Sequence, residues 1–223
     1  MKLTVIGKYG PYPAPGGKTS CYLLESGTAK IALDFGSGAI SGIGRYIDIK
    51  ALDAVILSHL HNDHIADVLP YEYVALLHKI RPKLFLPLAG CPQLELIKSS
   101  GLFELCGITD GFSTKINGLA LTFGLMPHAV ESYAVRVSNG KAALVYTGDT
   151  EWDERLVPFC QGASHIVMDC CGGSHAAIGD AERLADLTGA VVIATHLFPG
   201  LPYASNHPGV RIAEEGDRYE FSH

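Results

Sequence analysis

Short apolar runs separated by turn-forming segments make up the first quarter of the chain. Each run is about as long as a single strand. The segments between the runs are rich in glycine and proline, as in residues 9–17, which predicts a strand-rich beginning joined by loops. The strands predicted in this part of the chain are residues 3–6, 21–24, 30–33 and 54–58.

Helical patterns and strand-like runs follow one another through the rest of the chain. Pro70 lies inside the longest helical pattern, residues 65–79, and predicts a kink or a break there. Two apolar runs flank Asn139-Gly140, a dipeptide typical of β-hairpin turns. The other predicted helices are residues 92–99, 154–159 and 180–187, and the other predicted strands are 83–86, 119–125, 133–137, 142–146, 166–168, 191–194 and 218–221.

A strand-rich segment followed by alternating helices and strands is typical of α/β proteins in which two sheets carry helices on their outer faces. The composition agrees with this class. Apolar residues make up 48% of the chain and charged residues only 18%, which indicates a folded domain and not a disordered one. The length of 223 residues suits a single domain, residues 1–223, with a sizeable core.

The net charge and the cysteines indicate which partners and which cellular environment to expect. A formal net charge of −6 argues against strong nucleic-acid binding, although a local basic patch is compatible with it. The six cysteines form no C-x-x-C unit, and we interpret them mostly as small core side chains of a reduced protein. With no signal-peptide pattern and no apolar stretch of membrane-spanning length, we expect a cytoplasmic protein with no membrane partner.

Residues 59–64, His-Leu-His-Asn-Asp-His, carry the clearest chemical signal in the chain. The segment places three imidazoles and one carboxylate directly after the predicted strand at 54–58, and all four are good ligands for a divalent metal such as zinc. His59 and His61 are two residues apart, so in an extended backbone their side chains point the same way and can hold one ion. Asp63 and His64 follow as the chain turns, where they can reach a second ion.

Three more predicted strands end in a residue of ligand type. His128 follows the strand at 119–125, Asp149 follows the strand at 142–146, and His196 follows the strand at 191–194. Each alone has an ordinary structural explanation, as a hydrogen-bonded histidine or a turn residue. Together with the motif at 59–64 they form a set of five histidines and two aspartates, which suits a site for two metal ions with one bridging carboxylate.

The remaining histidines and one glycine-rich turn give weaker signals. His78, His165 and His223 lie in no motif, whereas His207 lies in a loop where it could line a pocket. The turn at 34–38, Asp-Phe-Gly-Ser-Gly, could expose backbone amides to an anion or simply form a tight turn.

These motifs, taken in order, resemble those of the metallo-β-lactamase-fold hydrolases from one end of the chain to the other. The matching features are Asp34 in LDFGSG, HLHNDH at 59–64, His128, YTGDT around Asp149 and THL at 195–197. The resemblance implies an αββα sandwich, α/β in class, with two mixed sheets and helices on the outer faces. Asp149 with the threonine after it, and the segment 174–190, resemble the ribonuclease Z-like phosphodiesterase branch.

The resemblance also implies a role for each site residue. One metal would take His59, His61, His128 and Asp149, and the other would take Asp63, His64, Asp149 and His196. His175 would be the acid that protonates the leaving group, and Asp169 would orient it. The family usually has Glu at the position of Asp169 and often Ser-Thr where this chain has Ala176-Ala177.

A second departure concerns the substrate. Ribonuclease Z enzymes commonly carry a tRNA-binding arm between the residues that correspond to His128 and Asp149, whereas the hairpin fills residues 129–148 of this chain. The sequence is similar in this respect to the arm-less members of the branch, which act on small substrates. Members of the branch are often dimeric, and the oligomeric state of this chain is open.

We therefore expect a metal-dependent hydrolase with two divalent ions, zinc or manganese, that acts as a phosphodiesterase on small phosphodiesters, linear or cyclic. Asp63 would accept a hydrogen bond from the nucleophile as well as bind metal, and His175 would donate the proton to the leaving alkoxide. Three alternatives stay open: hydrolysis of a lactone, thioester or β-lactam, RNA processing, and a metal-holding binding module without turnover.

Overall fold

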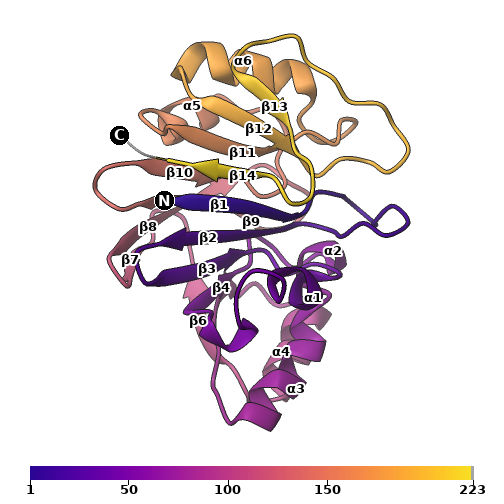
Figure 1. The fold of residues 1–223 in the computed structure, drawn as a ribbon, viewed down its shortest axis with the longest axis vertical. Coiled ribbons are helices and arrows are strands. Elements are labelled where there is room, and N and C mark those ends of the chain that lie inside the picture. The colour runs from indigo at the N-terminus through magenta and orange to yellow at the C-terminus, as the bar shows by residue number, and fades with distance from the viewer. Residues whose placement is uncertain (222–223) are drawn as a thin grey trace.

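Two seven-stranded sheets lie face to face in the computed structural model of the chain, which describes residues 1–221 (Figure 1). Helices α1 to α4 cover the outer face of the first sheet, and α5 and α6 cover the outer face of the second. This order of layers confirms the α/β class and the αββα sandwich that the sequence predicts. His223 lies outside the described residues.

The first sheet runs in the spatial order β14-β1-β2-β3-β4-β5-β6. Its strands β14, β1, β2 and β3 pair in antiparallel fashion, and β3 to β6 are parallel. The strands are β1 (Lys2–Gly7), β2 (Cys21–Ser26), β3 (Ala29–Leu33), β4 (Ala54–Ile56), β5 (Lys83–Pro87), β6 (Glu104–Ile108) and β14 (Arg218–Glu220).

The second sheet repeats this plan in the spatial order β7-β8-β9-β10-β11-β12-β13. Its strands β7 to β10 are antiparallel, and β10 to β13 are parallel. Since the carboxyl ends of parallel strands share one edge, each sheet offers one such edge for a site. The strands are β7 (Ser113–Ile116), β8 (Leu119–Met126), β9 (Ser132–Ser138), β10 (Ala143–Tyr146), β11 (His165–Asp169), β12 (Val191–Thr195) and β13 (Val210–Ile212).

The helices begin and end at residues whose chemistry explains the boundary. Pro92 occupies the first turn of α4, where a missing N–H is tolerated. The Asp180 carboxylate accepts the backbone N–H of Ala177 at the start of α6, and Gly189 ends that helix in a left-handed conformation. The helices are α1 (Ala39–Ile43), α2 (Asn62–Ile65), α3 (Val68–His78), α4 (Pro92–Ser99), α5 (Leu156–Cys160) and α6 (Ile178–Thr188), with a 3-10 turn η1 (Ile49–Ala51). Within residues 1–221, every helix is too short or too polar to cross a lipid bilayer.

The helix predicted at residues 65–79 is divided in the structure. It forms α2 and α3, and the break falls at Ala66 and Asp67, before Pro70. Pro70 instead lies in the first turn of α3, where its missing N–H removes no intrahelical hydrogen bond. The prediction of a break near this proline is confirmed, but the single helix was wrong because the motif at 59–64 itself begins a helix at Asn62.

Short elements with weak patterns were not predicted. Helix α1 and strands β6, β7 and β13 fall in segments that the apolar pattern left without an assignment. β6 and β13 are short, and they have exposed or intermediate positions along much of their length. The hairpin around Asn139-Gly140 is confirmed, with β9 and β10 paired in antiparallel register.

The glycine-rich turn at 34–38 serves an internal carboxylate. The backbone N–H groups of Gly38 and Ile40 donate to the two oxygens of Asp67, at 3.1 and 2.8 Å. The turn is therefore fixed against the start of α3, and these amides are used inside the protein. Cys21, Cys160 and Cys170 are buried, as expected, whereas Cys91, Cys106 and Cys171 are only partly buried.

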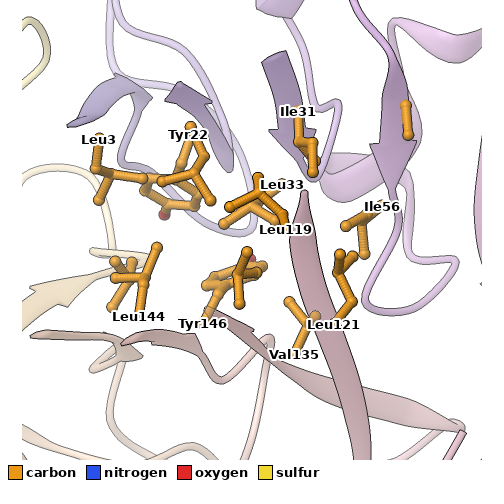
Figure 2. Packing of buried hydrophobic residues seen from close by; sticks show 14 of the residues in the cluster. Leu3, Tyr22, Ile31, Leu33, Ile56, Leu119, Leu121, Val135, Leu144 and Tyr146 are labelled. Carbon is orange, nitrogen blue, oxygen red and sulfur yellow. The ribbon is translucent and has the colours of Figure 1, made fainter. Parts of the chain in front are cut away.

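Apolar side chains from the inner faces of both sheets form the central core (Figure 2). Leu3, Ile31 and Ile56 from the first sheet face Leu121 and Leu144 from the second, and all five are almost fully buried. Two further clusters join each sheet to its own helices. The core between the sheets therefore fixes how the carboxyl edges of the two sheets meet.

Loss of a core side chain between the sheets should weaken the whole fold. Leu144→Ala should lower the free energy of unfolding by about 2–5 kcal/mol, because it removes apolar contacts and leaves a cavity. Leu187→Ala, at a position on α6 that is 48% exposed, is the matched control and should cost under about 1 kcal/mol. Urea denaturation followed by circular dichroism measures both, and equal losses would contradict this account of the core.

Candidate metal centre

The ends of four strands bring the predicted ligands to one place. β4 leads into His59 and His61, β8 into His128, β10 into Asp149, and β12 into His196. These strands belong to both sheets, so the predicted ligands meet where the edges of the two sheets face each other. The sequence predicted this convergence from the positions of the residues at strand ends.

The first group of ligand atoms comes from three histidines and one aspartate: His59, His61, His128 and Asp149. His61 Nδ1 lies 3.0 Å from His59 Nε2 and 3.2 Å from His128 Nε2. The Asp149 Oδ2 atom lies 3.7 Å from His59 Nε2 and 4.0 Å from His128 Nε2. These four residues are those that the resemblance implies for one metal.

The second group comes from Asp63, His64 and His196, with Asp149 beside them. His196 Nε2 lies 3.1 Å from Asp63 Oδ2 and 3.4 Å from Asp149 Oδ2. His64 Nε2 lies 3.5 Å from Asp63 Oδ2 and 3.2 Å from Asp149 Oδ1. Asp149 therefore lies between the two groups, with one oxygen toward His64 and the other toward the histidines of both groups.

The residues present suit divalent cations. Two nitrogens bound to one tetrahedral zinc ion at about 2.1 Å are roughly 3.4 Å apart, close to the spacing of the first group. Among residues 1–221, His64 Nε2 and Asp149 Oδ1 are buried with no hydrogen-bond partner, although they face each other at 3.2 Å. Such atoms are costly to bury unless something satisfies them. Nitrogen and oxygen donors without sulfur accept zinc or manganese.

Asp34 fixes the orientation of His64 in the second group. Its carboxylate is fully buried and accepts hydrogen bonds from the backbone N–H and hydroxyl of Ser58, from Tyr146 and, at 2.6 Å, from His64 Nδ1. Since His64 donates through Nδ1, its Nε2 is the atom left to bind a cation. Ser58 Oγ lies 3.0 Å from His59 Nδ1, which fixes the His59 ring in the same manner.

The sequence pointed to Asp34 only as part of a family motif and gave it no role in the site. Asp34 is separated from its partners along the chain and has a left-handed backbone, with a φ of 54°. An aspartate that follows a buried strand and precedes Gly-x-Gly was the one available signal, but turn residues commonly show that pattern.

Buried charges set the protonation of the site. Burial lowers the pKa of His59, and the neighbouring His64 lowers it further, so His59 is held neutral as a ligand must be. Burial opposes a charge on His64 and His196 too, but Asp149, together with Asp34 at His64 and Asp169 at His196, offsets this effect and raises the pKa of both histidines. Burial likewise opposes ionisation of Asp63, yet a hydrogen bond from His196 and the nearby His64 imidazole hold its pKa well below the usual range. The candidate metal centre therefore favours positive charge beside its carboxylates.

Two glycines allow the backbone to come close to the ligands. A Cβ on Gly10 would lie 1.9 Å from His196 Nε2, so the loop before β2 can cross this imidazole only as glycine. Gly148 precedes Asp149 with a φ of 61°, and a Cβ there would lie 2.7 Å from Ser58 Cβ. The turn that presents Asp149 therefore needs glycine for both conformation and space.

His175 lies at the mouth of the same site and is held by Asp169. Its Nδ1 lies 2.6 Å from Asp169 Oδ2, and this hydrogen bond raises the pKa of His175 above its ordinary value. Asp169 is buried and also accepts the backbone N–H groups of Thr150 and Cys171. The shorter aspartate thus reaches the imidazole, and the His175 side chain keeps 19% of its surface exposed.

The loop that carries His175 has Ala176-Ala177 where the family often has Ser-Thr, and backbone hydrogen bonds hold this loop in place. Gly172 donates to the Ala176 carbonyl, and the Ala176 N–H donates to the Thr150 carbonyl. The Ala176 side chain is buried against the second sheet. The ring centroid of His175 lies 5.2 Å from that of His128 and 5.4 Å from that of His196.

The other histidines lie outside the two groups. His207 lines an open surface cavity with Ser205 and Glu182, and its Nε2 lies 3.0 Å from Asp186 on α6. His165 packs against Phe221 with the two rings tilted, at 4.4 Å between ring centroids. His78 ends α3 at the surface.

Comparison with known proteins agrees with this geometry. The family profile described as "Metallo-beta-lactamase superfamily" matches residues 14–84. A curated relative, the probable metallo-hydrolase YhfI of Bacillus subtilis, is 30% identical over 235 residues, which cover 95% of this chain and 91% of that protein. The crystal structure of YhfI superposes with a TM-score of 0.89 at 28% identity, over 98% of this chain and 99% of that chain.

More distant structures share the fold. The short form of human tRNase Z has a TM-score of 0.80 at 16% identity and covers 99% of each chain. A diphosphatase from the PhnP family has a TM-score of 0.77 at 18% identity, over 99% of this chain and 96% of that chain. The chain belongs to the metallo-β-lactamase superfamily and is a YhfI-like hydrolase of that fold, with structural neighbours in the ribonuclease Z and PhnP branch.

Loss of the Asp34 carboxylate should weaken metal binding without removing a ligand. Asp34→Asn should lower the affinity for zinc about 10- to 100-fold, because an amide cannot accept from His64, Ser58 and Tyr146 together. Competition with a chelator of known affinity measures the change.

Asp186→Asn is the matched control, because Asp186 also bonds a histidine, His207, but at the surface. Its zinc affinity should equal that of the unmodified protein. Unchanged affinity in a folded Asp34→Asn protein would contradict the orienting role of Asp34.

Proposed function

We propose that the protein is a phosphodiesterase that uses two divalent cations, zinc or manganese, to hydrolyse small phosphodiesters, linear or cyclic. The single observation that carries this proposal is the position of His175, oriented by Asp169 at the mouth of the candidate metal centre. An alkoxide leaving group needs a proton, whereas many acyl substrates have leaving groups that do not. Membership of the metallo-hydrolase family supports the coarser statement that it is a metal-dependent hydrolase.

In this proposal the two groups of ligand atoms hold one ion each. His59, His61 and His128 would hold the first ion, Asp63, His64 and His196 would hold the second, and Asp149 would join both. When bound, such ions supply Lewis acidity, neutralise charge on the phosphate and activate water for attack.

The chain's own residues would then place the protons. His175 would donate from Nε2 to the leaving oxygen, since its Nδ1 faces Asp169. Asp169 would hold the ring in that orientation and stabilise its protonated form. Asp63, which is ionised and partly exposed, would accept a hydrogen bond from the attacking water.

Two features favour a small substrate over a long RNA. Between His128 and Asp149, the chain forms a short loop and the β9–β10 hairpin, and both strands of that hairpin are part of the second sheet. No part of this segment is therefore left to serve as a tRNA-binding arm. The net charge of −6 offers no general substitute for the phosphate contacts that a long RNA requires.

Two other activities remain candidates. The fold shared with human tRNase Z makes RNA cleavage, with another subunit supplying the arm, the first alternative. Attack on a carbonyl, as in a lactone, thioester or β-lactam, is the second, because the same centre could serve it.

Turnover of a substrate panel tests the proposal. The purified protein is assayed in zinc and in manganese with bis(p-nitrophenyl) phosphate, a cyclic nucleotide, a thioester and a precursor tRNA. We expect hydrolysis of the small phosphodiesters, weak and salt-sensitive binding of the tRNA, and no thioesterase activity of comparable rate.

Two variants serve as controls for the panel. Asp149→Ala should lose metal and nearly all activity, whereas Asp153→Ala, which removes a surface aspartate paired with Arg155, should keep both. Efficient site-specific cleavage of precursor tRNA at moderate salt, or thioester hydrolysis alone, would refute the proposal.

Replacement of His175 should affect rate and spare metal loading. His175→Ala should lower turnover roughly 100-fold or more for esters of poor leaving groups, because the leaving alkoxide loses its proton donor. The loss should shrink for p-nitrophenyl esters, whose leaving group needs no proton. Steady-state kinetics over a series of leaving groups, with metal content measured alongside, makes the test. An equal loss across the series would indicate a structural role instead.

A further inference from the structure

A surface pocket of about 270 Å³ opens beside the first group of ligands. Its walls are mostly apolar and include Leu60, Pro87, Ala89, Cys91 and Val130. The Val130 side chain in this wall is 42% exposed. The roles proposed for the metal ligands and for His175 leave these apolar walls without a function.

The pocket is continuous with the candidate metal centre. His61, a member of the first group, lines both. Val130 follows His128 by two residues, and Leu60 lies between His59 and His61. The loop between β5 and α4 also lines the pocket. A substrate held at His61 would therefore have part of its surface in this pocket.

The charge of the pocket excludes a second phosphate. Among residues 1–221, no lysine or arginine lines the pocket, and its polar side chains include the amide of Gln93 and the carboxylate of Glu131. A carboxylate repels an anionic group, and apolar walls give it no compensating donor. The occupant with matching chemistry is an uncharged, apolar organic group.

The pocket's position also decides which side of the phosphodiester it takes. His175, which the proposed function assigns to the leaving group, does not line the pocket. With the leaving oxygen placed at His175 by the proposed function, the pocket is left for the substituent that stays on the phosphorus. A cavity of about 150 Å³ already accepts benzene, so 270 Å³ leaves room for a larger ring system.

We propose that this pocket makes the protein selective for phosphodiesters whose retained substituent is uncharged and apolar, of the size of one or two aromatic rings. This inference rests on the proposed function, since it names the substrate class of the same site. Burial of about 55 Å² of apolar surface is worth a factor of about ten, which sets the expected scale.

Two esters with the same leaving group test the selectivity. Methyl p-nitrophenyl phosphate and 2-naphthylmethyl p-nitrophenyl phosphate both release p-nitrophenolate, so the bond that breaks is the same in each. We expect kcat/KM to be at least tenfold higher for the naphthylmethyl ester. Equal values would overturn the inference and leave the phosphodiesterase proposal standing.

A binding measurement separates the two proposals further. The 2-naphthylmethyl ester of methylphosphonic acid lacks the p-nitrophenyl leaving group, and its naphthalene fluorescence should change on binding to the metal-loaded protein. It should bind at least tenfold tighter than the methyl ester of the same acid, measured by competition. No turnover of either p-nitrophenyl ester would refute the phosphodiesterase proposal, and equal binding of the two phosphonates would refute the pocket.

Two variants locate the effect in the pocket. Val130→Asn and Ala89→Trp should each lower the naphthylmethyl-to-methyl ratio of kcat/KM several-fold, the first by adding polarity and the second by filling the space. Leu88→Asn is the matched control, because Leu88 is 49% exposed but packs over Gly107 and does not line the pocket. A ratio that survives both pocket variants, or that falls equally in the Leu88→Asn protein, would overturn the assignment.

Discussion

Two buried tyrosines hold the carboxyl edges of the two sheets together at the site. Tyr146 of the second sheet donates to Asp34 at the end of β3, and the Tyr22 hydroxyl of the first sheet lies 2.6 Å from Thr195 Oγ1 at the end of β12. Their rings are 5.1 Å apart between centroids, inside the core between the sheets. At the site, polar contacts from one sheet to the other therefore lie next to the apolar core between the sheets. If the sheets shifted against each other, these contacts and the meeting of the ligands would be lost together.

Most of the site's polar atoms are satisfied by residues that are themselves buried. Asp34 orients His64, and Asp169 orients His175, and each carboxylate is fixed in turn by backbone N–H groups. Asp34, Asp149 and Asp169 are all buried at the site. Burying three carboxylates this close together costs stability unless positive charge lies among them. The same electrostatics that burden the fold create a strong preference for cations at Asp149. The apolar core supplies the stability that offsets this cost.

Much of the fold could be predicted because its strong elements have regular patterns. The strands of both sheet centres, the hairpin at Asn139-Gly140 and helices α4 and α6 follow from apolar periodicity and turn residues. β6, β7 and β13 did not follow, because edge strands expose many positions and owe their conformation to pairing with a neighbour. The division between α2 and α3 arises because Asp67 bonds the amides of a distant turn, a contact that local propensity does not contain.

The sequence by itself determined which residues have the chemistry of ligands and where they stand relative to strands, and it pointed to His175 and Asp169. Ligand identity is a local property, and strand ends are visible in local patterns. Tertiary structure decided that Asp149 lies between two groups, that Asp34 orients His64, and that Leu60, Ala89 and Val130 enclose one pocket. These relations join residues far apart in the chain, and their distances depend on how two sheets pack, which no local pattern fixes.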